Sequence, residues 1–182
     1  MFDAFPRRHP GMSVWEAVTT GFDGGFVPRT RDASLEQRRQ GGVGYVDVSD
    51  EELGLGLEST NAEVIREKHK HWRIARCWEV LKALGPEAWN GRDSAMNFAK
   101  QNFSSLSAGE QRLVLLMRAL VGRPPLVLLD EVWSGMDEDM IASARRYLRS
   151  EEGLTKDQAV IVITHWEEEV PWTGSEVKKF AL

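Results

Sequence analysis

The chain has 182 residues, which is about one domain at the usual figure of roughly 100–200 residues per domain. It is 42% hydrophobic and 28% charged, with 16 Gly and 7 Pro. This ordinary composition excludes collagen-like, low-complexity and strongly disordered classes. The formal net charge of −5 argues against nucleic acid as the main partner, because phosphate binding favours a basic surface.

Three features bear on the cellular setting. The single cysteine, Cys77, cannot form an internal disulfide or a thiolate zinc site, which fits a reducing compartment. No apolar run reaches the roughly 18–20 residues that span a bilayer. Residues 1–8 lack the apolar core of a secretory signal. We therefore expect a soluble, cytoplasmic protein, with attachment to a membrane through a partner left open.

The first part of the chain is interrupted by glycine. Ser13–Glu16 has the form of a capping box, a hydroxyl followed three residues later by a carboxylate, and predicts a short helix that stops at Gly21. Residues 31–60 hold five glycines, and we interpret them as an extended loop or an insertion, with a short helix at 34–40.

Residues 61–84 predict a longer helix that ends at Gly85. Ile74, Trp78 and Leu81 recur at spacings of four and three residues, so they are expected on one face of this helix.

The same helix carries a run of cations around Trp72. A nucleic-acid patch is one interpretation of cations beside an aromatic residue. A solvated helix face is favoured instead, because Glu63 and Glu67 are interleaved with the cations. The cations are Arg66, Lys68, Lys70, Arg73 and Arg76.

Beyond residue 103 helices and short apolar runs alternate. An amphipathic helix is expected over about 108–121 and a second over about 138–150. The apolar runs 126–129 and 160–163 follow these helices. Short, fully apolar runs between helices are typical of strands buried on both faces in a parallel sheet, whose ligands gather at the carboxyl ends of the strands.

Polar residues follow both predicted strands. Asp130 and Glu131 end the first, and His165 follows the second. One carboxylate at such an edge can hold Mg²⁺ while the other deprotonates a water for attack on a phosphoryl group. The plain alternative is that two acids end a strand in solvent and that the histidine is structural.

Two further stretches begin helices. Ser107 and Glu110 have capping-box spacing, and the small residues at 107–109 leave backbone N–H groups open to an anion. An ordinary capping box explains the same pattern without a ligand. Ser134–Asp137 indicates a turn and the N-cap of the next helix.

Taken in order, these stretches resemble the C-terminal half of an ABC-type ATP-binding domain. Leu106–Arg112 (LSAGEQR) resembles the ABC signature, and Leu126–Glu131 resembles Walker B with its catalytic glutamate. Ser134–Asp137 resembles the D-loop, and Thr164–His165 the switch histidine. Thr19–Phe22 and Thr164–Glu167 also resemble soluble ABC proteins of the photorepair-protein type.

The resemblance implies an α/β fold, a partial P-loop NTPase-type parallel sheet joined to an ABC helical subdomain. Residues 1–103 would form the helical subdomain, with the insertion at about 31–60. Residues 104–182 would form the C-terminal part of the ATPase core, with the signature, Walker B, the D-loop and the switch histidine.

The resemblance also implies roles at the nucleotide. Asp130 would serve Mg²⁺ directly or through water, Glu131 would be the general base, and His165 would sense or stabilise the γ-phosphate. The signature would contact ATP bound by an opposing domain in a head-to-tail dimer, and the D-loop would reach across that interface. The signature residues are Ser107, Ala108, Gly109 and Glu110, and those of the D-loop are Ser134, Gly135 and Asp137.

The chain departs from the family pattern at several positions. Ala108 replaces the usual glycine and Glu110 the usual glutamine. Val132 and Trp133 stand where Pro-Thr is usual and are expected to reshape the turn after Walker B without removing a catalytic group.

The largest departure is the phosphate loop, which needs the pattern Gly-x-x-x-x-Gly-Lys-[Ser/Thr]. None of the seven lysines follows a glycine, so this pattern is absent from the sequence. Phe5–Arg8 and Ser13–Val18 resemble sequence that follows the family's glutamine loop, so the chain is expected to begin just past that loop. Without the loop and its lysine, the chain alone is expected to hydrolyse ATP negligibly and to leave a sheet edge or apolar face uncovered.

The sequence is compatible with two functions. The first is ATP binding and hydrolysis as part of an ABC-type ATPase, with ATP and Mg²⁺ as cofactors. The second is a non-catalytic interaction or regulatory module that lends its signature to ATP held by a partner. The implied partner is a second ABC nucleotide-binding domain, in a homodimer, a heterodimer or a tandem chain. A membrane subunit is compatible with either function.

Overall fold

The structure is a computed structural model that describes residues 11–23, 59–91, 93–174 and 177–180, with the backbone alone for residues 59–69. The insertion expected at 31–60, with its short helix at 34–40, lies almost wholly outside the described residues. The elements in chain order are α2 (Val14–Thr19), η1 (Thr20–Asp23), α4 (Ser59–Leu84), α5 (Pro86–Trp89), α6 (Ala95–Lys100), η2 (Phe103–Ser105), α7 (Ala108–Val121), β1 (Leu126–Asp130), α8 (Glu138–Leu148), β2 (Ala159–Ile163) and η3 (Glu167–Glu169).

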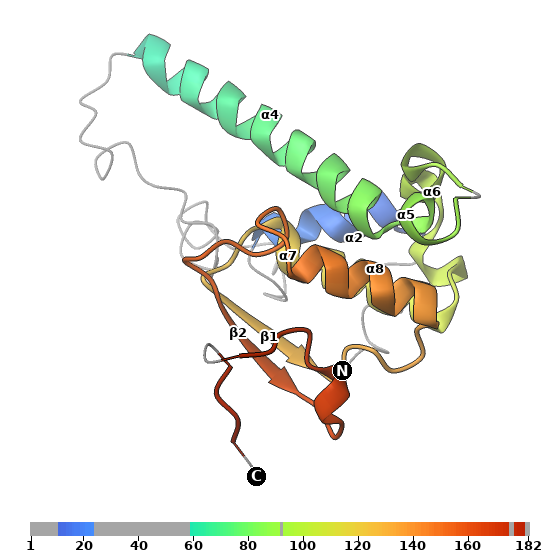
Figure 1. Cartoon of the computed structure of the whole chain (residues 1–182). Helices are drawn as coiled ribbons and strands as arrows, with labels where there is room; N and C mark the ends of the chain where they lie inside the picture. The colour runs from blue at the N-terminus through green and yellow to red at the C-terminus, as the bar shows by residue number, and fades with distance from the viewer. Residues whose placement is uncertain (1–10, 24–58, 92, 175–176, 181–182) are drawn as a thin grey trace, which may run out of the picture.

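The sheet is parallel, as the sequence predicts. Strands β1 and β2 pair in a register that sets Leu126 opposite Ala159 and Asp130 opposite Ile163. Helix α8 lies between them in the chain and makes the crossover. The helices gather on one side of the two strands, and α4 projects beyond the rest of the molecule (Figure 1).

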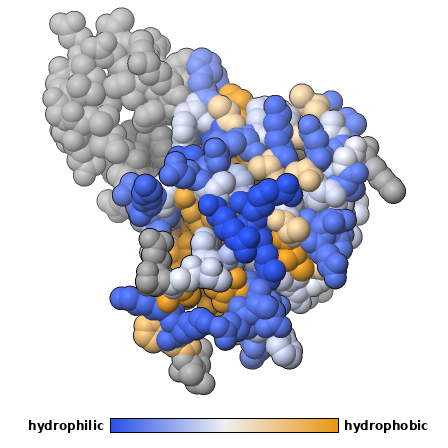
Figure 2. Space-filling view, viewed as in Figure 1, coloured by the Kyte–Doolittle hydropathy of each residue, from blue (hydrophilic) through white to orange (hydrophobic). Residues whose placement is uncertain are grey.

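The prediction that both strands are buried on both faces is wrong for the described residues. In β1, Val127 and Leu129 are buried, whereas Leu126 and Leu128 are 45% and 63% exposed. In β2, Ile161 and Ile163 are about half exposed. The reason is that the described helices cover one face only, so the other apolar face meets solvent. Hydrophobic surface is visible over the strands in the lower part of Figure 2.

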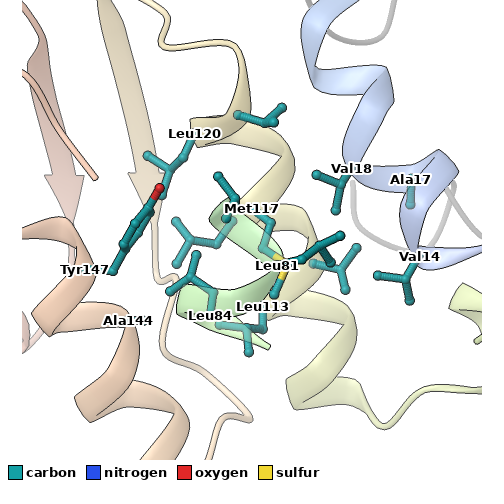
Figure 3. Close-up of a cluster of buried hydrophobic side chains, with 14 of the residues drawn as sticks. Val14, Ala17, Val18, Leu81, Leu84, Leu113, Met117, Leu120, Ala144 and Tyr147 are labelled. Carbon is teal, nitrogen blue, oxygen red and sulfur yellow. The ribbon is translucent and has the colours of Figure 1, made fainter. Parts of the chain in front are cut away.

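Helix α7 lies at the centre of the hydrophobic core. It packs against α2, α4 and α8, so its side chains have neighbours on several sides. Figure 3 shows Leu113, Met117 and Leu120 of α7 between Val18 of α2 and Tyr147 of α8. A helix with apolar residues on most of its surface is stable only when it is enclosed in this way. The core therefore runs across residue 103 without a break.

The first helix is fixed by its cap and by a close approach to α7. The Ser13 amide donates to Glu16 Oε2 at 2.8 Å, and the Glu16 amide donates to Ser13 Oγ at 3.2 Å, so the predicted capping box is present. The helical path continues through Gly21 in η1 rather than stopping there. A Cβ on Gly21 would lie 2.1 Å from the Arg118 carbonyl oxygen, so glycine is needed for packing on α7.

The side chains in the C-terminal half of α4 pack on the body of the molecule. Cys77, Leu81 and Leu84 are fully buried, and Trp78 packs on Trp15 with ring centroids 4.7 Å apart and ring planes tilted by 42°. Ile74, which the spacing places on this buried face, is 40% exposed, because α4 begins to leave the body of the molecule at that point.

Arg76 is also placed differently from the prediction of a solvated face. It is 2% exposed, and its guanidinium donates to the carbonyl oxygens of Leu120 at 3.3 Å and of Glu152 at 2.6 Å. Glu79, one turn along α4, supplies the countercharge. Arg76 therefore links α4 to the end of α7 and to the segment that leads into β2.

Cys77 is a buried small side chain with no disulfide partner, as the sequence predicts. Burial raises the pKa of its thiol from 9.0 to about 12. A raised pKa keeps the folded thiol neutral while the unfolded thiol ionises, so stability is lost as the pH rises from about 9 towards 12.

We expect the free energy of unfolding, measured by urea denaturation, to fall between pH 8 and pH 10.5 by about 2 kcal/mol more in the natural chain than in Cys77→Ala. Tyr147, whose pKa burial also raises to about 12, contributes equally to both proteins and cancels in this comparison. An equal fall in both proteins would contradict the burial of the thiol.

Candidate functional site

The parallel pairing brings the polar ends of both strands to one edge of the sheet. Asp130 is the last residue of β1 and lies opposite Ile163, the last residue of β2. Glu131 and His165 therefore leave the sheet side by side, and His165 Nε2 lies 3.0 Å from Glu131 Oε1. Both side chains are open to solvent, at 83% exposed for His165 and 52% for Glu131. This accessible pair could receive a substrate or a water molecule.

The backbone of Glu131 is held in an unusual conformation. Its φ is +43°, in the left-handed region that side chains other than glycine rarely adopt. The Glu131 amide donates to the Ile163 carbonyl at 2.9 Å, and Arg112 Nη1 donates to the Glu131 carbonyl at 3.3 Å. Strained residues held by such contacts concentrate at functional sites, which makes Glu131 the strongest candidate here.

The start of α7 is a closed capping box. Ser107 donates to Glu110 Oε2 from its amide at 2.8 Å and from its hydroxyl at 2.7 Å, and the Glu110 amide donates to Ser107 Oγ at 3.3 Å. The capping box that the spacing predicts is therefore present. Ala108 is exposed at the first turn of the helix.

The loop after Glu131 packs against this helix start. Gly135 has a φ of +80°, and a Cβ added to Gly109 would lie 2.5 Å from the Gly135 carbonyl oxygen. The two glycines therefore allow the backbones of α7 and the loop to meet. Ser134 is exposed in the turn, and Asp137 is the N-cap of α8, with its carboxylate accepting from the Met140 amide at 2.8 Å.

The four predicted stretches thus form one connected arrangement. Arg112 and Gly109 tie the start of α7 to the loop after β1, and Glu131 ties that loop to His165 at the end of β2. Asp130 lies beside Glu131, exposed at the same edge. Ser107 contacts Glu110 of its own capping box and His165 contacts Glu131, so these two residues belong to different parts of the arrangement.

The two carboxylates at this edge are the kind of oxygen ligand that Mg²⁺ takes. No group of three or more His, Cys, Asp or Glu side chains that could hold a metal occurs among the described residues. Mg²⁺ needs only one or two carboxylates, since water and phosphate oxygens complete its shell. Asp130, with Glu131 beside it, fits that requirement.

The sequence did not reveal the role of Trp133. Its side chain is 4% exposed, and its indole Nε1 donates to the Glu169 carbonyl at 2.8 Å. The guanidinium carbon of Arg145 lies 5.4 Å from the centroid of the indole ring. The sequence marks this position because Val132 and Trp133 stand where Pro-Thr is usual. The hydrogen-bond partner, Glu169, is 36 residues away in the chain, and no local pattern points to it.

Comparison with known proteins identifies the family. The family model described as ABC transporter matches residues 22–134. This match spans more than half of the chain, and the chain belongs to the ABC transporter family. No solved structure shows a significant match to it.

Three relatives illustrate the relationship. An uncharacterized ABC transporter ATP-binding protein of Schizosaccharomyces pombe is 44% identical over 68 residues, which is 37% of this chain and 14% of that protein. The zinc import ATP-binding protein ZnuC 2 of Hahella chejuensis is 42% identical over 69 residues, 36% of this chain and 27% of that protein. The energy-dependent translational throttle protein EttA of Haemophilus influenzae is 28% identical over 161 residues, 88% of this chain and 25% of that protein.

The chain spans about a quarter or less of the length of these relatives. Family membership and the ATP-binding relatives support the function of an ATP-binding ABC domain. Within the described part of the chain, no helix is both long enough and apolar enough to cross a membrane.

The strain at Glu131 can be tested by comparing two variants that both remove the side chain. We expect Glu131→Gly to be more stable to urea than Glu131→Ala by about 1–2 kcal/mol, because only glycine adopts a positive φ without cost.

The control for this comparison is Ala142→Gly, at an exposed position within α8, where glycine is expected to be the less stable residue by about 1 kcal/mol. Greater stability of Glu131→Ala than of Glu131→Gly would show that the left-handed backbone is absent in solution.

Proposed function

We propose that the chain supplies the signature and general-base part of an ATP-hydrolysing ABC site, which works by ATP-dependent head-to-tail dimerisation. The observation that carries this proposal is the contact between Glu131 and His165, with Arg112 of the signature helix holding the Glu131 carbonyl. A module used only for docking has no chemical need for an exposed carboxylate and imidazole in contact at the end of a parallel sheet.

Glu131 is the proposed general base. Its carboxylate is about half exposed, so a water molecule can reach it, and its fixed backbone limits where that water is held. Proton transfer to such a positioned group typically contributes about 10²–10⁴-fold to a rate. His165 lies 3.0 Å from this carboxylate, where its imidazole can orient Glu131 and contact a terminal phosphate.

Asp130 is the proposed residue for Mg²⁺, directly or through water. When bound, Mg²⁺ would neutralise charge on the phosphate oxygens. Asp130 is exposed at the end of β1, so its carboxylate can meet a hydrated ion without rearrangement of the core.

The signature and the D-loop are proposed to act across the dimer interface. Ser107 and Ala108 are exposed at the positive end of a 14-residue helix, where an anion is favoured, and Gly109 and Glu110 lie in the same turn. Ser134, Gly135 and Asp137 of the D-loop are exposed beside that turn. A phosphate held by an opposing domain could approach both segments together.

We further propose that the phosphate loop comes from another polypeptide segment, in the same protein or in a partner. The sequence contains no Gly-Lys pair, and one apolar face of the sheet is exposed. Parallel sheets are normally covered on both faces. The exposed face, formed by Leu126, Leu128, Ile161 and Ile163, is therefore the proposed seat of the segment that carries the loop.

The proposed partners follow from the proposal that this chain supplies only part of the ATP site. They are a second ABC nucleotide-binding domain and, as in the import systems to which some relatives belong by name, a membrane subunit. Nucleic acid remains a less favoured partner, because the chain carries a net charge of −5. We propose that the domain works in the cytoplasm.

Glu131→Gln tests the proposed chemistry in the native assembly purified from its source cell. Steady-state ATP hydrolysis is expected to fall by about 10²–10⁴-fold, because the amide cannot accept a proton. The matched control is Glu138→Gln, an exposed carboxylate in the first turn of α8, which should leave the rate unchanged.

The 182-residue chain alone is expected to show negligible turnover in the same assay. Turnover that persists in the Glu131→Gln assembly would favour the alternative, in which the chain is a non-catalytic module that lends its signature to ATP held by a partner. The missing Gly-Lys pair is the observation in favour of that alternative.

Leu128→Thr tests the proposed seat of the phosphate-loop segment. Leu128 is 63% exposed, so threonine should change the chain's free energy of unfolding little while weakening its association with the rest of the assembly, measured by sedimentation. Val127→Thr is the control on the opposite face, where burial makes the substitution destabilise the chain itself by roughly 1–3 kcal/mol. Association unchanged by Leu128→Thr would exclude this face as the seat.

A further inference from the structure

Trp133 connects the loop after β1 to the segment after β2. Its indole is buried, and the indole N–H donates to the Glu169 carbonyl at 2.8 Å. Glu169 is the last residue of η3, which begins two residues after His165. Trp133 itself lies two residues after Glu131. The hydrogen bond therefore joins the two segments that carry the candidate general base and the candidate switch histidine.

Two arginines in and just after helix α8 donate further hydrogen bonds to the segment after β2. Arg145 donates from Nη2 to the Glu168 carbonyl at 2.6 Å, while its guanidinium lies over the Trp133 ring. Arg149 donates from Nε to the Pro171 carbonyl at 2.5 Å. Three carbonyls of one short segment are thus each taken by a donor from residues 133–149.

Hydrogen bonds fix the backbone on both sides of His165, at Ile163 and at Glu169. On one side the Glu131 amide donates to the Ile163 carbonyl at 2.9 Å. On the other side Trp133 holds Glu169, whose carboxylate in turn accepts from the Thr164 hydroxyl. The His165 side chain is itself 83% exposed, and its ring contacts Glu131. The backbone that carries His165 is therefore anchored on both sides of it.

We infer that Trp133 is a positioning residue that sets the distance between His165 and Glu131. The inference deepens the proposed function. Only its expected effect on ATP hydrolysis rests on that function, because the contact between His165 and Glu131 can be measured without ATP. Trp133 stands where the resemblance expects threonine, a side chain too short to replace an indole N–H that reaches across to η3.

Trp133→Phe separates the hydrogen bond from the packing. Phenylalanine keeps an apolar ring in the buried site but has no donor for the Glu169 carbonyl. A hydrogen bond of this kind has a net strength that corresponds to about a five-fold change in an equilibrium. We therefore expect amide hydrogen exchange at Glu169 and Val170 in the full 182-residue chain to accelerate about five-fold, with no change at Ala17 in α2.

The second measurement is the nuclear Overhauser contact between the His165 ring and the Glu131 side chain. It is expected in the natural chain and weakened in Trp133→Phe. The control is Trp166→Phe, which removes a neighbouring indole that is 63% exposed and should change neither measurement. A contact of unchanged intensity in Trp133→Phe, or one weakened equally in Trp166→Phe, would overturn the inference.

Arg145→Met serves if Trp133→Phe fails to fold. It removes the donor to the Glu168 carbonyl and the cation over the indole, so the same two signals should change in the same direction. Arg146→Met, at the next, exposed position of α8, is its control. An unchanged contact between His165 and Glu131 in Arg145→Met would again overturn the inference.

Activity in the native assembly distinguishes this inference from the proposed function. Trp133→Phe is expected to lower kcat for ATP and to leave KM unchanged, because a positioning residue acts on the reacting geometry rather than on nucleotide binding. If Glu131→Gln leaves turnover intact while Trp133→Phe still releases His165, the proposed function fails and the positioning role stands. If kcat is unchanged by Trp133→Phe while Glu131→Gln abolishes turnover, the positioning role fails and the proposed function stands.

Discussion

Burial of α7 is the interaction on which the rest of the described structure depends. Six of its apolar side chains are almost completely enclosed, and at roughly 1.5–3 kcal/mol each they contribute on the order of 10 kcal/mol, which is comparable with the net stability of a domain. The same helix begins at Ser107 and carries Gly109 and Arg112, which contact the loop after β1. Packing in the core therefore fixes where the candidate functional residues lie.

The residues that stabilise the fold and the candidate reactive residues lie in different parts of the molecule. The side chains that hold the fold are buried between α2, α4, α7 and α8, whereas Asp130, Glu131 and His165 lie at the open edge of the sheet. The contact between Glu131 and His165 contributes little to folding, because exposed pairs are typically worth about 0–1 kcal/mol. The positive φ of Glu131 also costs energy. Both features are easier to explain by function than by stability.

The exposed apolar face of the sheet lies next to the candidate site residues Asp130 and Glu131. Leu128 and Ile161 would be expected in the interior of a parallel sheet, yet they meet solvent on the face away from the helices. The proposed phosphate-loop segment would cover this face. Asp130 ends β1 beside this face, and Glu131 follows it. Docking of the proposed segment would therefore both bury the apolar face and bring phosphate groups to the two carboxylates.

The sequence by itself determined the local elements and the family. Capping boxes at Ser13 and Ser107, the glycine after α4 and the apolar runs of β1 and β2 depend on neighbouring residues. The order of the motifs along the chain is enough to indicate the ABC transporter family. The missing phosphate loop also led to the expectation of an uncovered sheet edge or apolar face. Only the tertiary structure decided the burial of Arg76, which residues form the uncovered face, and the link between Trp133 and Glu169. These depend on residues far apart in the chain, whose approach is set by packing, and no local pattern encodes it.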